Sequence, residues 1–247
     1  MDLHLEGRTA IVCGASSGIG RGIAEALAEE GANVVMFARR KELLEREAAR
    51  LGALAVVGDV TVAEDLERVV RTTLDSFAGI DILVNNSGGP PRSAGIALDP
   101  ESVRTAVELL LVSVVRLTSL CLPQLERSGR GRIVNIASSS VREPIDSLAL
   151  SNAVRPGVIG WAKTLARELG PLGITVNSIA PGWIDTERVR EVSPEGVTEN
   201  ELAAIPVRRL GTPREIGDLV AFLCSERASY ITGTVIPFDG GLTRSLL

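Results

Sequence analysis

The stretch that decides the fold is Ile11-Val12-Cys13-Gly14-Ala15-Ser16-Ser17-Gly18-Ile19-Gly20. An apolar run over 9–12 predicts a buried strand before it, and apolar residues at helical spacing over 23–28 predict a helix after it. A strand, a glycine-rich turn and a helix together predict the phosphate-binding corner of a doubly wound sheet. The helix N-terminus offers unpaired N–H groups and a partial positive charge to a pyrophosphate. Because many strand-to-helix turns carry glycine for backbone reasons alone, the rest of the chain has to decide.

Size and composition indicate one domain spanning 1–247. The chain has 247 residues, of which 45% are hydrophobic, and a net charge of -5, so nucleic acid is not an expected partner. No apolar window reaches the ~18 residues of a membrane span, and the N-terminus lacks the pattern of a signal peptide. The three cysteines are scattered, which favours a reduced, cytoplasmic protein. No cluster of residues has the spacing of a metal site.

Strand patterns alternate with helix patterns from end to end. Strands are predicted at 9–12, 33–38, 53–57, 80–85, 132–136, 174–179 and 234–237, and further helices at 41–51, 62–77, 100–126, 149–169 and 213–224. This alternation predicts a Rossmann-type α/β fold: a parallel sheet covered by helices on both faces, in three layers. The charged segment 186–209 lacks a clear period and follows a strand. It is either a surface excursion or, as we favour, a mobile flap over the ligand.

The spacing Gly14-x3-Gly18-x-Gly20 resembles the T-G-x3-G-x-G turn of the short-chain dehydrogenase/reductase family, with Cys13 where the family usually has threonine. Five later motifs also resemble family signatures: Asp59-Val60, Asn85-Asn86-Ser87-Gly88, Pro181-Gly182-Trp183-Ile184-Asp185-Thr186, the run 209–216, and Phe238-Asp239-Gly240-Gly241. The resemblance covers nearly the whole chain and is greatest for the 3-oxoacyl-(acyl carrier protein) reductases. It implies an oxidoreductase that uses a nicotinamide dinucleotide.

The end of the second strand indicates which dinucleotide. Ala38 stands where relatives that prefer NAD usually place aspartate, and Arg39 and Arg40 follow it. An arginine fork suits a 2′-phosphate, so NADP(H) is predicted over NAD(H), although two solvated arginines at a helix start would read the same. The cofactor residues that the resemblance implies are Gly14, Ser16, Ser17, Gly18, Ile19, Gly20, Arg39, Arg40, Asp59, Val60, Asn86, Gly88, Pro181, Gly182, Ile184 and Thr186.

The catalytic residues of the family are mostly replaced. The family uses a tyrosine as proton donor, a lysine four residues later, a serine on the fifth strand and an asparagine on the preceding long helix. The serine is present as Ser138, but the tyrosine and lysine positions read Ser151 and Arg155, and Leu110 occupies the asparagine slot. A serine hydroxyl is far less acidic than a phenol, whose pKa is ~10. Arginine keeps its charge, since its pKa is above ~12.

No other side chain offers an obvious substitute for the missing acid. Tyr230 lies near the C-terminus and is expected to be structural, and His4 precedes the first strand. Lys163 is roughly 18 Å along the helix from Ser151, by the rise per residue. Losing a general acid typically costs ~10²–10⁴ in rate.

Three hypotheses therefore stay open. The chain is an NADP(H)-dependent reductase with a non-standard site formed by Ser138, Ser151 and Arg155, acting on a small molecule or an acyl thioester. Alternatively it is a cofactor-binding sensor or partner subunit without turnover, or a scaffold that binds no nucleotide. The resemblance implies a homotetramer or homodimer joined through the two long helices, and the apolar run 107–122 fits either such an interface or packing within the chain.

Overall fold

Seven parallel strands form one sheet in the computed structural model, which describes residues 2–192 and 195–246. The sheet order is β3-β2-β1-β4-β5-β6-β7, so the chain first winds outward in one direction from β1 and then in the other. The strands are β1 (Thr9–Cys13), β2 (Asn33–Ala38), β3 (Leu54–Val57), β4 (Ile82–Asn85), β5 (Arg132–Ile136), β6 (Thr175–Pro181) and β7 (Val235–Phe238). The switch of direction between β1 and β4 opens a crevice at the carboxyl ends of the strands, where ligands bind in such sheets.

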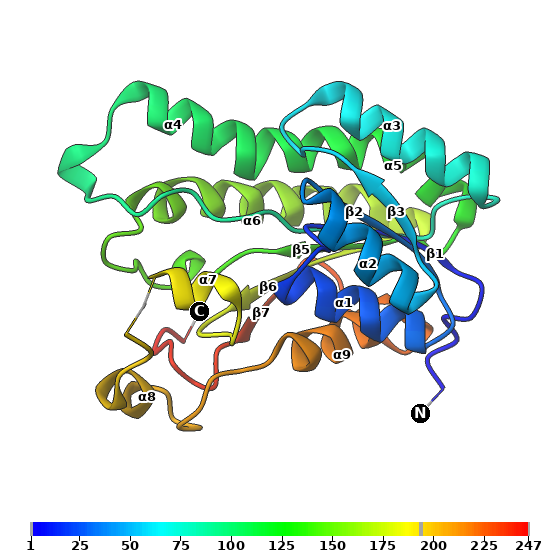
Figure 1. Cartoon of the computed structure of the whole chain (residues 1–247). Coiled ribbons are helices and arrows are strands. Elements are labelled where there is room, and N and C mark those ends of the chain that lie inside the picture. The colour runs from blue at the N-terminus through cyan, green and yellow to red at the C-terminus, as the bar shows by residue number, and fades with distance from the viewer. Residues whose placement is uncertain (1, 193–194, 247) are drawn as a thin grey trace.

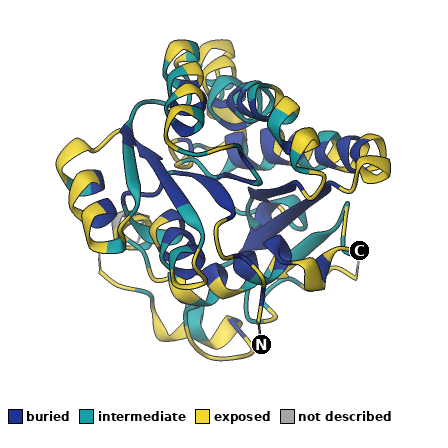
Figure 2. Ribbon diagram, turned by 90° about the vertical axis from the view of Figure 1, so that its right-hand side faces the viewer, coloured by how far each residue is buried: buried dark blue, intermediate teal, exposed yellow. Residues whose placement is uncertain are grey.

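Helices cover both faces of the sheet, as predicted (Figure 1). One face packs against α1 (Gly18–Glu29), α2 (Lys41–Leu51) and α9 (Pro213–Cys224). The other packs against α3 (Ala63–Ser76), α5 (Ser113–Ser128) and α6 (Ala149–Leu169). The buried residues gather on the strands and on the helix sides turned toward them (Figure 2). The result is the expected α/β/α sandwich with a hydrophobic layer on each side of the sheet.

Helices α1 and α9 approach each other closely because glycines line their contact. A Cβ on Gly22 would lie 2.3 Å from the carbonyl oxygen of Pro213, and one on Gly217 would lie 2.3 Å from that of Gly22. No side chain fits there. This contact holds the glycine turn before α1 against the C-terminal part of the chain.

The long helix predicted at 100–126 begins as expected but is not regular. Asp99 caps α4 (Pro100–Val107), accepting hydrogen bonds from two backbone N–H groups. A π-helical turn, η2 (Glu108–Val112), separates α4 from α5. Such turns are rare and concentrate at functional sites, and Leu110 lies within this one. The apolar spacing along the chain does not reveal this change from α-helical to π-helical hydrogen bonding.

The same continuous stretch, Pro100–Ser128, is long and apolar enough to cross a membrane, judged by length and composition alone, with a mean hydropathy of 1.8 and 33% of the window buried. Contacts of α5 with α3 and β4, and of η2 with α6, place it in the outer layer of the sandwich. Packing against the sandwich accounts for only part of its apolar composition, because 33% of the window is buried.

Of two predictions about irregular segments, the mobile flap at 186–209 stays a prediction and the structural role of Tyr230 is wrong. The segment 186–209 contains two short helices, α7 (Glu187–Val192) and α8 (Glu199–Ala204); its predicted mobility stays a prediction, and positions 193–194 lie outside the described residues. Tyr230 was expected to be structural, but its side chain is fully exposed. It lies between η5 (Glu226–Ala228) and β7, where the short loop gives a large ring nothing to pack against.

Candidate active site

The glycine turn has the geometry of an anion cradle. Gly14 and Gly18 adopt left-handed backbone angles, φ +61° and +53°, which favour glycine. A Cβ on Gly20 would lie 2.3 Å from the carbonyl oxygen of Gly14. Ser17 is the N-cap of α1, but its side chain does not cap the helix. The first N–H groups of α1 therefore remain available to a bound phosphate.

Two later loops bring predicted cofactor residues to this turn. The amide nitrogen of Asn86, just after β4, donates to the carbonyl oxygen of Cys13 at 3.1 Å and would lie 2.6 Å from a Cβ on Gly14. The methyl group of Thr186, after β6, would lie 3.3 Å from a Cβ on Gly18. The carboxyl ends of β1, β4 and β6 thus converge, as a parallel sheet requires of residues that follow its strands.

The two arginines after β2 are not merely solvated. Arg39 pairs with Asp59 at 3.5 Å, with 77% of its side chain exposed. Arg40 donates through Nη1 to Glu187 at 2.8 Å and through Nη2 to the hydroxyl of Ser17. Arg40 therefore joins the end of β2, the glycine turn and the start of α7.

The remaining predicted cofactor residues line the same edge of the sheet. The carboxylate of Asp59 accepts hydrogen bonds from the N–H and the hydroxyl of Thr61. The backbone N–H of Asp59 donates to the carboxylate of Asp65 at 2.8 Å. Val60 packs against the core on the α3 side. Position 182 has no room for a side chain, because a Cβ on Gly182 would lie 2.7 Å from the Cβ of Asp239. Five further predicted residues remain: Ser16 and Ile184 are buried, Pro181 ends β6, Gly88 is exposed after β4, and Ile19 on α1 packs against the core.

A buried polar cluster contains the two residues that the resemblance places at the tyrosine and lysine positions. The hydroxyl of Ser151 lies 3.2 Å from that of Ser140 and accepts a hydrogen bond from Nε of Arg155 at 3.2 Å. Nη1 of Arg155 donates to the carbonyl oxygen of Ile136 at 3.2 Å. All three side chains are buried. The sequence indicated Ser151 and Arg155 but missed Ser140, whose only signal was its place in the serine run 138–140.

Burial lowers the pKa of the Arg155 guanidinium. Desolvation lowers the pKa of its guanidinium to about 10, below the expected value but still well above neutrality. Among the residues that the structure describes, its hydrogen-bond partners are a hydroxyl and a carbonyl oxygen, and no carboxylate pairs with the cation. An uncompensated buried charge is costly, and a site that retains one is a candidate for binding polar or anionic groups.

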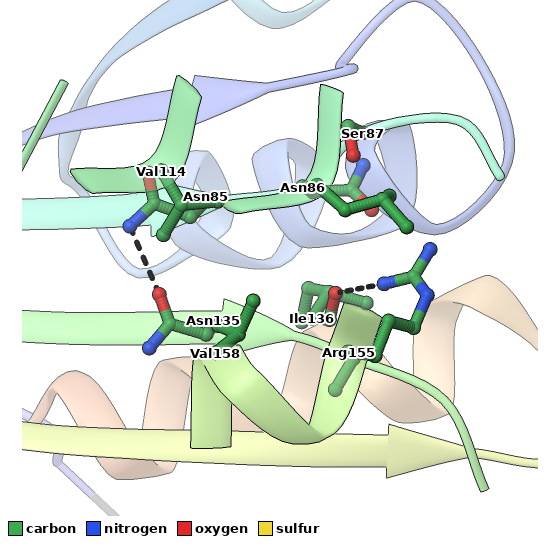
Figure 3. A pocket seen from close by; sticks show the side chains of 10 residues that line it. Asn85, Asn86, Ser87, Val114, Asn135, Ile136, Arg155 and Val158 are labelled. Carbon is green, nitrogen blue, oxygen red and sulfur yellow. Dashed lines mark hydrogen bonds between the residues drawn. The ribbon is translucent and has the colours of Figure 1, made fainter. Parts of the chain in front are cut away.

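A small cavity of about 10 Å³, room for a single water molecule, lies beside Arg155 (Figure 3). The Arg155 side chain extends from α6 toward Asn86 and Ser87 (Figure 3). Leu110 and Val158 give the cavity apolar walls. Leu110 cannot hold a water by its side chain, so the proton relay implied by the family's asparagine has no counterpart at this position.

The floor of this region contains asparagines that sequence reasoning did not assign. Asn85 on β4 donates to Asn135 on β5 at 2.9 Å and to Thr118 at 3.1 Å. The amide nitrogen of Asn135 is buried and has no hydrogen-bond partner among the described residues. Asn85 was noticed only as part of a motif, because pairing across two strands is not visible along the chain.

Ser138 is the member of the predicted catalytic set that stays accessible. It follows β5, is partly exposed, and accepts a hydrogen bond from the N–H of Ser140 at 3.1 Å. That bond leaves its hydroxyl proton available to a substrate oxygen.

None of the three alternative acids reaches this region. His4 pairs with Asp2, and Lys163 donates to the carbonyl oxygen of Gly233 at 2.7 Å. In the part of the chain that the structure describes, no three His, Cys, Asp or Glu side chains are grouped to hold a metal ion. The cysteines are free and buried, and burial raises the pKa of Cys13 and Cys224 to about 12, so they are poor nucleophiles.

Known proteins resemble this chain over its whole length. The family model described as enoyl-(acyl carrier protein) reductase matches residues 14–243. The 3-oxoacyl-(acyl carrier protein) reductase of Vibrio cholerae is 38% identical over 242 residues, covering 97% of this chain and 99% of that protein. The rabbit (Oryctolagus cuniculus) dehydrogenase/reductase SDR family member 4 is 36% identical, covering 96% and 94%.

Solved structures give the same result. L-sorbose reductase from Gluconobacter frateurii, complexed with NADPH and L-sorbose, superposes with a TM-score of 0.92 at 33% identity over 100% of both chains. YwfH, described as an NADPH-dependent reductase involved in bacilysin biosynthesis, superposes with a TM-score of 0.93 at 28% identity, over 98% of this chain and 100% of that one.

Proposed function

The chain belongs to the short-chain dehydrogenase/reductase family, and from this premise we propose that it is an NADP(H)-dependent oxidoreductase with a non-standard active site. The observation that supports the proposal is the convergence of Gly14, Gly18, Asn86 and Thr186 around an uncapped helix N-terminus, with Arg40 beside it. Glycines leave the space that a pyrophosphate needs, and the arginine supplies the charge that distinguishes NADP(H) from NAD(H).

The residues present fit a dinucleotide. The glycine turn would hold the pyrophosphate, Arg40 and Arg39 the 2′-phosphate, and the loop 181–186 the carboxamide of the nicotinamide. When bound, the nicotinamide supplies hydride chemistry at its ring. Arg155, charged and directed toward Asn86 and Ser87 (Figure 3), would donate to the hydroxyls of the adjacent ribose.

The chain's own catalytic contribution would come from Ser138, Ser151 and Arg155. Ser138 would donate a hydrogen bond to the substrate oxygen, since its proton is free and its side chain partly exposed. Ser151 would position Arg155 through their 3.2 Å bond. Because no phenol is present at position 151, the proton would come from water, and we expect slower turnover than a tyrosine site gives.

The direct test is NADPH consumption with a panel of ketones, enones and acyl thioesters. Turnover above buffer that falls in the Ser138→Ala variant supports the proposal. Absence of turnover across the panel, with the cofactor shown to be bound by titration, contradicts it. The panel also identifies whether a small molecule or an acyl thioester is the preferred substrate.

A second candidate is a cofactor-binding sensor or partner subunit without turnover. It is favoured by the apolar Leu110 in the relay position and by the burial of Ser151 among other hydrogen-bonding groups. It predicts NADPH affinity with no chemistry. A scaffold that binds no nucleotide would instead show the same melting temperature with and without NADPH, in the native protein and in Gly18→Asp alike.

We also propose a homotetramer or homodimer, joined through the apolar stretch 100–128 and α6. The support is the apolar composition of this stretch combined with its partial burial in the single chain. Sedimentation velocity of the native protein and of Val115→Asp tests this: the variant should dissociate while keeping its circular dichroism spectrum. The free buried cysteines fit a reducing cytoplasm, which we propose as the location.

A further inference from the structure

Three segments far apart in sequence meet at one exposed ion pair. Arg40 lies after β2, Ser17 at the start of α1, and Glu187 at the start of α7. The carboxylate of Glu187 accepts from Nη1 of Arg40 at 2.8 Å, and Nη2 of the same guanidinium donates to Ser17. Glu187 therefore pairs with the same guanidinium that donates to Ser17 of the glycine turn.

Glu187 places a negative charge next to the glycine turn, where an anionic ligand would bind. Ser17 is directed to this cluster instead of capping α1, which leaves the helix N-terminus uncapped. The neighbouring Thr186 lies directly over Gly18, where its methyl group would be 3.3 Å from a Cβ. The segment that begins α7 therefore lies against the turn, with a carboxylate on the arginine that a phosphate would need.

We infer that Glu187 is a built-in competitor for the 2′-phosphate of NADP(H), which has to release Arg40 before the cofactor can bind it. The inference rests on the proposed function and deepens it, because it assigns a residue outside the phosphate-binding motif to cofactor choice. A phosphate on the same guanidinium would lie close to the Glu187 carboxylate and be repelled by it, so the two anions would compete for Arg40. NADP(H) binding would then move the start of α7, whereas NAD(H), lacking the 2′-phosphate, would leave the pair in place.

The expected size of the effect follows from the exposure of the pair. The two side chains are 50% and 51% exposed, and exposed ion pairs contribute little individually, because solvent and salt screen them. Glu187 is therefore a modulator of affinity. The arginine hydrogen bond lowers the pKa of the Glu187 carboxyl, so the competitor is ionised at neutral pH.

The test is a fluorescence titration of NADPH and NADH with native protein and with Glu187→Gln, which removes the charge and keeps the shape. We expect the variant to bind NADPH about two- to five-fold more tightly, with unchanged affinity for NADH and a smaller gain at high salt. Glu199→Gln is the matched control, since it removes an exposed carboxylate from α8 in the same region of the chain. Melting temperatures without cofactor check that each variant is folded.

A double-mutant cycle assigns the effect to Arg40. In an Arg40→Gln background, Glu187→Gln should no longer change the affinity for NADPH. Unchanged or weaker NADPH binding by Glu187→Gln alone overturns the inference and leaves the proposed function intact. An equal gain for NADPH and NADH also overturns it, because the competitor would then act on the shared pyrophosphate. Failure of the native protein to bind NADPH contradicts the proposed function itself.

Discussion

Nε of Arg155 donates to the hydroxyl of Ser151 at 3.2 Å, one turn apart on α6, and both side chains are buried. The hydroxyl of Ser140 lies 3.2 Å from Ser151 on its other side. Ser151 is therefore committed to a structural hydrogen-bond network, and it is too short to project from the helix as a phenol would. On the placement that we propose, the pair would keep a positive charge at the family's lysine position without supplying a phenol as proton donor.

The missing donor can be restored by substitution. We expect Ser151→Tyr, Arg155→Lys and Leu110→Asn together to raise the rate of ketone reduction by ~10²–10⁴, the usual contribution of a general acid. The measurement is NADPH oxidation with a 3-oxo ester. A matched control places phenylalanine at position 151 with the other two changes, supplying the ring without the hydroxyl. If the folded, cofactor-bound triple variant stays inert, our placement of these residues is wrong.

Cofactor preference should respond to a single carboxylate at the end of β2. Ala38 is 8% exposed and immediately precedes Arg39 and Arg40. We expect Ala38→Asp to weaken NADPH binding roughly 10- to 100-fold, the cost of opposing a charge-assisted contact, and to strengthen NADH binding through the ribose hydroxyl. Thermal shifts with each cofactor measure this. Ala38→Asn, which adds the same volume without charge, should change NADPH binding much less.

Stability should depend on the close contact between α1 and α9. A Cβ on Gly22 would lie 2.3 Å from the carbonyl oxygen of Pro213, so Gly22→Ala forces two backbones apart. Overpacking of this kind costs about 1–3 kcal/mol, which lowers the melting temperature of a chain this size by roughly 3–10 °C. Gly79→Ala serves as the control, since a Cβ there meets nothing within 4 Å. Equal melting temperatures for the two variants would contradict this packing.

Acid should weaken the start of α9. Hydrogen bonds from Arg209, and then from Thr212, lower the pKa of Glu215 from 4.5 to about 2. Because the folded-state pKa is depressed, the stabilisation is fully present above pH 4.5 and is lost as the pH falls toward 2. We expect Glu215→Gln to melt below the native protein at pH 7, with the difference narrowing between pH 4.5 and 2. A difference that stays constant across this range would show that the carboxylate charge is not responsible.

The elements of this fold could be predicted from local patterns. Apolar runs and helical spacing located the strands and major helices, and Asp99-Pro100 correctly marked the start of α4. The predicted bounds of β2 and β5 are confirmed, but those of the other strands shifted by one or two residues, as for β4, which begins at Ile82. Hydrogen bonding to neighbouring strands decides where pairing starts. The π-turn around Leu110 could not be predicted, since its hydrogen-bond register depends on packing against α6.

The sequence by itself determined the α/β alternation and the glycine turn, and it predicts the replacement of the tyrosine, lysine and asparagine, because each depends on which residue occupies a position or on a short-range period. Only the tertiary structure decided that Ser140 joins Ser151, that burial lowers the pKa of Arg155 to about 10, and that Glu187 contacts Arg40 across 147 positions of the chain. Desolvation and ion pairing depend on distances between side chains that folding brings together, and no spacing along the chain encodes those distances.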